Sequence, residues 1–169
     1  MASNANFISQ FVMGGDPCTY KESGELQAEM SKLTHPARPD VDWRQVEKLC
    51  LALFRQNGVE LQTLVCYVLA ITRRQGLAGM ADGLGSLDIL LQRWADFWPV
   101  QVHSRISLLS WVTEKMQQAL RTLDIQYQDL PQIYRCVQHL SAIETTLQQC
   151  ELWHMTKLDL LAGQFRNTA

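Results

Sequence analysis

The chain has 169 residues, 47% of them hydrophobic and 8% aromatic, with 15 basic side chains against 17 acidic ones. A soluble chain of this length is expected to form one domain and to bury about 70% of the surface that it exposes when unfolded. Its net charge of −2 excludes the strongly basic surface by which proteins usually bind nucleic acid or anionic membranes.

Apolar residues recur at helical spacing along the sequence, and the alternation typical of strands is nearly absent. The first helix is expected over residues 20–32, and the prolines within residues 34–40 predict an extended connector. Asp42 then suits an N-cap. Gln45 completes its capping box, and the second helix should end at Asn57-Gly58.

The third and fourth helices carry the most apolar part of the sequence. The third, Glu60 to Gln75, is apolar on almost every side over its middle, which predicts a buried central element that ends at Gly76. The fourth is expected from Ala78 to Phe97 and should end at Trp98-Pro99.

Two further segments complete the pattern. Ser104 is expected to cap the fifth helix, and Asp129 to cap a sixth that has Pro131 in its first turn. From there an apolar stripe continues to Phe165. The stripe predicts either one helix about 50 Å long or two helices with a break near Gln149.

The expected architecture is all-α, an antiparallel helical bundle of about six or seven helices with a long C-terminal helix. Residues 1–19 are expected to form an N-terminal arm and residues 20–169 a single domain. Five widely spaced cysteines, an odd number, indicate reduced thiols and a cytoplasmic location. The uncharged apolar stretch Leu61 to Thr72 has 12 residues, whereas a membrane span needs about 20, so insertion of this chain into a membrane is not expected.

Cys136-x2-His139 and Cys150-x3-His154 have spacings found in zinc sites. On one continuous helix the two pairs are about 21 Å apart, so no ion binds all four residues unless the helix breaks. Catalytic motifs such as G-x-S-x-G are absent, and no catalytic residue, metal or cofactor is expected. A small cytoplasmic hydrolase or metal-dependent enzyme is the alternative from another class, because a catalytic triad assembles only in space.

The glycine-rich run from Gly76 to Gly85 lacks the Lys-Ser/Thr of a phosphate-binding loop and does not follow a strand. Gly76 is instead expected to end a helix. Gly79 and Gly83, four residues apart on the next helix, are expected to let a neighbouring backbone approach closely, which offsets their low helix propensity.

The five tryptophans are either core residues or anchors for a protein partner. Trp94 and Trp98 are expected on one face of the fourth helix, since they are four residues apart. Trp98 with Val100, and separately Trp153, are the candidates for partner binding.

The order of several motifs resembles a known family. These motifs are Asp42-Trp43-Arg44-Gln45-Val46-Glu47, then Glu60-Leu61-Gln62, then Gly76 to Leu84, and then Trp94 to Pro99. Together they resemble the ImpA N-terminal domain of bacterial type VI secretion proteins, shared by TssA, TagA and VasL, with the core motif over residues 41–99. The flanking segments Lys32 to Asp40, Val102 to Arg105 and Asp129 to Pro131 are closest to the VasL and TagA-like branch.

The resemblance implies a structural role and no enzymatic activity. It implies that the chain is an N-terminal fragment whose missing C-terminal region supports oligomerisation or membrane association. The partners implied are sheath, tube or baseplate subunits, in tail assembly or sheath regulation; a TssA-type baseplate or tail-cap subunit is the alternative. The family-motif residues expected to be structural are Trp43, Gly76, Gly79, Gly83, Trp94, Pro99, Arg105 and Trp111.

Overall fold

The computed structural model describes residues 8–37, 39–150 and 157–168. Seven α-helices lie within these residues, and the expected all-α fold is confirmed. Their bounds are α1 Lys21–Ser31, α2 Trp43–Gln56, α3 Leu61–Gln75, α4 Leu77–Leu91, α5 Val102–Thr122, α6 Leu130–Gln149 and α7 Leu158–Thr168. Short 3-10 turns at Pro17–Thr19 and Tyr127–Asp129 precede α1 and α6.

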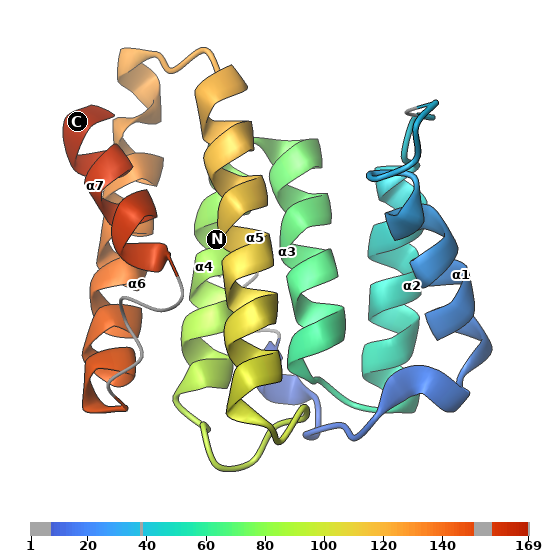
Figure 1. The fold of residues 1–169 in the computed structure, drawn as a ribbon. Coiled ribbons are helices and arrows are strands. Elements are labelled where there is room, and N and C mark those ends of the chain that lie inside the picture. Colours follow the sequence, from blue (N-terminus) through green and yellow to red (C-terminus); the bar gives the residue numbers. More distant parts are fainter. Residues whose placement is uncertain (1–7, 38, 151–156, 169) are drawn as a thin grey trace.

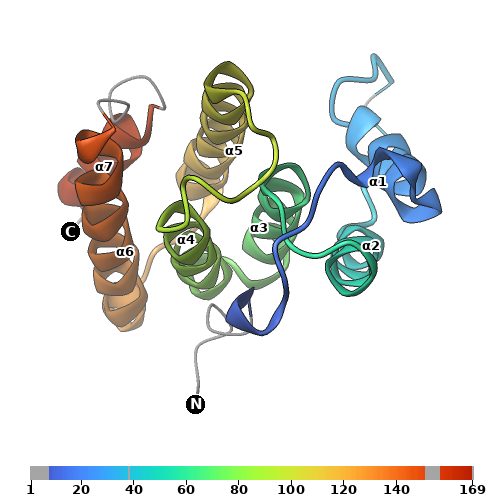
Figure 2. The same ribbon diagram turned by 90° about the horizontal axis from the view of Figure 1, so that it is seen from below.

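The helices form two layers, and helices that follow one another along the chain run antiparallel (Figures 1 and 2). One layer contains α2, α3, α4 and α6 in that order, and the other contains α1, α5 and α7. The central position of α3 explains its composition, because Leu61 and every residue from Thr63 to Thr72 are buried. Within the described part of the chain, no helix combines the length and apolarity that a bilayer crossing requires.

The ends of the first helices follow the local signals in the sequence. The Asp42 carboxylate accepts a hydrogen bond from the backbone N–H of Gln45 at 3.1 Å and so caps α2. The next helix, α3, is capped by the Glu60 side chain, and Gly76 follows its last residue with a positive φ of 63°.

The predicted end of the fourth helix and the predicted cap of the fifth are both wrong. The fourth helix, α4, ends at Leu91 instead of Phe97, and residues 92–98 turn back toward α5 because a buried arginine binds their carbonyl groups, as described below. Val102 begins α5 with Gln101 as its N-cap residue, so Ser104 lies inside the first turn. Tertiary contacts overrode local propensity at both places.

The apolar stripe after Pro131 belongs to two helices, the second of the two alternatives that the sequence allows. One of them, α6, ends at Gln149, and α7 runs antiparallel beside it (Figure 1). Leu158, Leu161 and Phe165 of α7 are fully buried. A straight helix would extend beyond the bundle and expose these three side chains, so folding back recovers their hydrophobic stabilisation.

The segment before α1 is packed against the turn between α2 and α3. Ile8 is only 1% exposed. The backbone of Val59 donates to the carbonyl of Val12 and accepts from the N–H of Gly14, both at 2.8 Å. A Cβ on residue 58 would lie 2.6 Å from the carbonyl oxygen of Val12, and the φ of Gly58 is 105°. The close approach of the two backbone segments therefore requires glycine at this position.

Candidate functional site

Two adjoining hollows, together called the groove, lie along α5, the upper one between α1 and α5 and the lower one between the start of α5 and the segment before it. The upper hollow, of about 420 Å³, has Met30 of α1 and Trp111 of α5 in its walls and Val65 of α3 in its floor. The lower hollow, of about 660 Å³, is lined by the Trp98–Val100 segment and the first turns of α5. Gln62, Ser107 and Leu108 line both hollows, so the groove is continuous.

The groove brings together four of the residues singled out in the sequence as candidates or motif positions, namely Trp98, Pro99, Val100 and Trp111. Trp98 is half-buried in the lower hollow, and Val100 beside it is 76% exposed. Trp111, half-buried, lines the upper hollow. Large apolar side chains left partly exposed in a concave surface are typical of protein-binding sites.

Arg105 holds the segment that carries Trp98. It is 3% exposed, and its guanidinium donates hydrogen bonds to the carbonyl oxygens of Pro99, Trp94 and Phe97 at 2.6, 2.5 and 2.5 Å. The same group lies 4.7 Å from the Trp94 ring centroid and 4.0 Å from that of Phe97, and burial lowers its pKa. Trp94 lines neither hollow. Because α4 ends at Leu91, the expected shared helical face of Trp94 and Trp98 is not present.

The lower hollow is also tied to the N-terminus of α3. The backbone N–H of Leu61 donates to the Trp98 carbonyl at 3.0 Å. The next two N–H groups, of Gln62 and Thr63, donate to the Glu60 carboxylate at 2.6 and 2.8 Å. Three donors that an isolated helix would leave without partners are thus satisfied, and the segment below the groove has a defined position.

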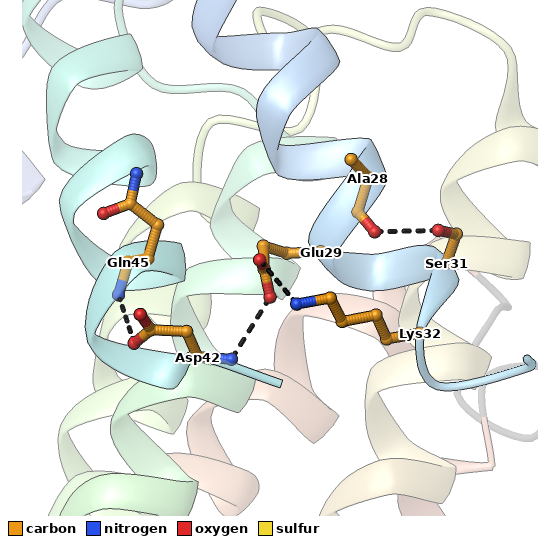
Figure 3. Close-up of polar contacts among 6 residues, drawn as sticks. All are labelled: Ala28, Glu29, Ser31, Lys32, Asp42 and Gln45. Carbon is orange, nitrogen blue, oxygen red and sulfur yellow. Dashed lines mark hydrogen bonds and ion pairs between the residues drawn. The ribbon is translucent and has the colours of Figure 1, made fainter. Parts of the chain in front are cut away.

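The opposite wall, the C-terminal half of α1, is fixed by Glu29 (Figure 3). One carboxylate oxygen of Glu29 accepts from the Asp42 backbone N–H at 3.1 Å, and the other pairs with Lys32 at 2.9 Å. Because Asp42 caps α2, this contact joins the end of α1 to the start of α2. The role of Glu29 does not follow from the sequence, since nothing in the local pattern shows that its side chain reaches a residue 13 positions away.

Trp43 and the glycines lie away from the groove. Trp43 begins α2 and is half-buried, with the Arg73 guanidinium 5.8 Å from its ring centroid. A Cβ on Gly79 would overlap the carbonyl oxygen of Ile71, and one on Gly83 would lie 2.7 Å from a methyl of Val68. The positions of both glycines therefore allow α3 and α4 to approach closely. Trp153, the other candidate for partner binding, lies outside the described residues.

An ion pair between helices joins the glycine motif to the C-terminal half of the chain. Asp82, between the two glycines, accepts from Arg135 of α6 at 2.6 Å. Both side chains are at least two-thirds buried, so this pair contributes more than a surface pair would. Sequence alone gave no indication of it, because 53 residues separate the partners.

The cysteines and histidines whose positions the structure describes do not gather into a cluster. Cys136 is in the core, where burial raises the pKa of its thiol to about 12, and burial lowers the pKa of half-buried His139. Cys150 follows the last residue of α6, and His154 lies outside the described residues. Among the residues with described positions, no three His, Cys, Asp or Glu side chains are placed to hold a metal ion.

Comparison with known proteins gives one match. The family model described as ImpA, N-terminal, type VI secretion system matches residues 8–114, which include the segment before α1, the Arg105-bound segment and most of the groove. No curated protein and no solved structure matches. The matching family is a structural one and not a known enzyme family. Because the match covers more than half of the chain, the protein belongs to the ImpA N-terminal family of the type VI secretion system.

Proposed function

We propose that this chain is a non-enzymatic interaction domain that acts in tail assembly or sheath regulation by binding another tail component through the groove. Family membership supports the secretion system as its setting. The observation that carries the proposal is the continuous groove in which Trp98, Val100 and Trp111 are accessible to a partner.

The chemistry of the groove favours a protein partner over a small molecule. Its lining is apolar side chains interspersed with amides and hydroxyls, together with one histidine, His103, and one lysine, Lys115, and both hollows are open to solvent. Small-molecule sites enclose most of their ligand and converge several polar groups on it. A shallow apolar surface flanked by polar groups is instead the arrangement of protein interfaces.

The TagA and VasL-like branch is the more specific form of the proposal. It rests on the flanking segments Lys32 to Asp40, Val102 to Arg105 and Asp129 to Pro131. That branch engages the sheath, whereas a TssA-type subunit contacts baseplate and tube as well. Binding to sheath subunits alone would therefore support the TagA-like role, and binding to the baseplate would support the TssA-type role.

The test is binding of the purified chain to purified sheath, tube and baseplate subunits of the same secretion system. We expect at least one of them to bind, and we expect Val100→Asp to weaken that binding about tenfold or more by placing a charge in the groove. Val12→Asp is the matched control, because Val12 is 73% exposed and lines neither hollow. Equal effects of the two substitutions, or no binding by any subunit, would contradict the proposal.

A further inference from the structure

The groove lies where a further helix could pack against the bundle. Three helices each present residues three or four apart to its upper hollow, which places them on one face of each helix. These residues are Gln27, Met30 and Ser31 of α1, Gln62, Val65 and Cys66 of α3, and Leu108, Trp111 and Lys115 of α5. The upper hollow lies between α1 and α5. Helices α5 and α7 of the same layer pack directly against each other (Figure 2).

The lining of the groove carries positive charge and no negative charge. Lys115 is the only Lys, Arg, Asp or Glu in its lining, so no carboxylate faces the occupant. The neighbouring Glu114 is paired with Lys157, the residue before α7, at 2.6 Å. No ion pair of Lys115 occurs among the described residues, so its ammonium group is available to a partner.

We propose that the groove binds an amphipathic helix of another tail component, with its apolar face between α1 and α5 and an Asp or Glu side chain opposite Lys115. The inference rests on the proposed function and specifies the chemistry of the partner. Helices that pack side by side with interlocking side chains fill such a position, as they do elsewhere in this bundle. A buried carboxylate partner would be selected because any other charge leaves Lys115 uncompensated.

A second copy of this chain is a poorer occupant. The large hydrophobic side chains that are exposed within the described residues are Val12, Val100, Val102, Tyr127, Tyr134 and Leu160. No two of these lie on the same α-helix, since Val102, Tyr134 and Leu160 belong to α5, α6 and α7 and the others lie outside the helices. None of the described helices therefore offers an exposed apolar stripe to a second groove.

The experiment uses overlapping 20-residue peptides that cover the sheath, tube and baseplate subunits, tested for binding to the purified full chain. We expect the bound peptides to share apolar residues at i, i+3 or i+4, and i+7 together with an acidic residue. Lys115→Glu should weaken their binding about tenfold or more, and Lys48→Glu, an exposed α2 control with the same charge change, should not. Reversing the acidic residue of the peptide to Lys should restore binding to the Lys115→Glu variant.

A second pair of variants tests whether the partner occupies the groove, without changing the charge of the chain. Ser107→Trp places a large ring where the two hollows meet, and Gln118→Trp places the same ring at an exposed position of α5 outside the groove. Both positions are exposed, so both variants should fold with the helical circular dichroism of the parent chain. Only Ser107→Trp should abolish binding of the peptides and of the whole subunit from which they derive.

The outcomes separate the inference from the proposed function. Binding of whole subunits that Val100→Asp weakens and Ser107→Trp leaves unchanged would overturn the helix inference and retain the proposed function. Bound peptides that are basic or lack helical periodicity would also overturn it. A dimer of the chain that Ser107→Trp dissociates would assign the groove to a second copy. Failure of every whole subunit to bind would overturn the proposed function itself.

Discussion

At the scale of single residues, Glu60 is a buried ionisable group beside the groove. Its side chain is fully buried, and its two oxygens accept the N–H groups at the start of α3. Burial is the largest influence on it and raises its pKa from 4.5 to about 7, while the hydrogen bonds act in the opposite direction. Glu60 therefore caps the helix at the cost of desolvating its charged form.

This shift predicts a pH dependence of stability. Because the pKa of Glu60 is higher in the folded chain than its ordinary value of 4.5, the folded state binds a proton more tightly than the unfolded state. The contribution of Glu60 to stability should thus rise as pH falls from about 8 to about 5, with a slope of at most about 1.4 kcal/mol per pH unit.

Urea unfolding of the parent chain and of Glu60→Gln, at pH 8 and at pH 5, measures this contribution. The comparison with the neutral variant cancels the titration of other groups, including His139. The parent should gain stability relative to Glu60→Gln as the pH is lowered. A difference between the two proteins that does not change with pH, or that changes in the opposite direction, would contradict the raised pKa.

Arg105 is the other residue whose side chain organises a whole segment. Replacing it by Met removes the donors of three buried carbonyl groups while keeping an apolar stem, so Arg105→Met should lower the free energy of unfolding by at least about 2 kcal/mol. Arg93→Met is the control, because Arg93 is exposed and its ion-pair partner among the described residues is the exposed Asp96, and its effect should stay within about 0.5 kcal/mol. Chemical denaturation of both variants decides the prediction.

At the scale of elements, the contact between α3 and α4 determines where the rest of the bundle packs. Gly79 and Gly83 face Ile71 and Val68 with no space for a side chain. Pairs of small residues at this spacing allow helix axes to approach closely, and the lost helix propensity of about 1 kcal/mol per glycine is offset by that packing. Their neighbour Asp82 then pairs with Arg135 and so links α6 to the same contact.

A pair of identical substitutions tests the packing of the glycines. Gly79→Ala should lower the melting temperature, because its methyl group would overlap the Ile71 backbone and force α3 and α4 apart at a cost of about 1–3 kcal/mol. Gly24→Ala, in α1 with no atom within 4 Å of the added carbon, should raise stability by about 0.5–1 kcal/mol. Similar effects of the two substitutions in thermal unfolding would show that propensity, not packing, dominates.

Some helix boundaries are determined by residues close in the sequence, and others by contacts with distant residues. The cap at Asp42 and the glycine after α3 depend on residues within one turn, and both follow from sequence patterns. The end of α4 depends on Arg105, which binds carbonyl groups up to 11 residues away. Local propensity within residues 92–98 therefore predicted a helix where the tertiary contacts favour a turn.

At the scale of the whole molecule, the balance of charges predicts how a partner binds. The 15 basic and 17 acidic side chains produce no dominant field, and the groove contains one lysine. The dissociation constant for the tail component identified in the binding test should therefore change less than about tenfold between about 50 mM and about 500 mM NaCl. Titrations at both salt concentrations measure it, and a steep weakening would indicate a largely electrostatic interface instead.

The sequence by itself determined the all-α class and the family, because helical periodicity and motif order are properties of neighbouring residues. It left open whether the helices number six or seven. It also identified Trp98, Val100, Arg105 and Trp111 without a shared location. Only the tertiary structure decided that the apolar stripe after Pro131 belongs to two packed helices and that α1 and α5 border one groove. The physical reason is the separation along the sequence of the interacting residues. The burial of α7 and the positions of Glu29 and Arg105 depend on contacts between distant parts of the chain, and local sequence patterns do not show which distant residues meet.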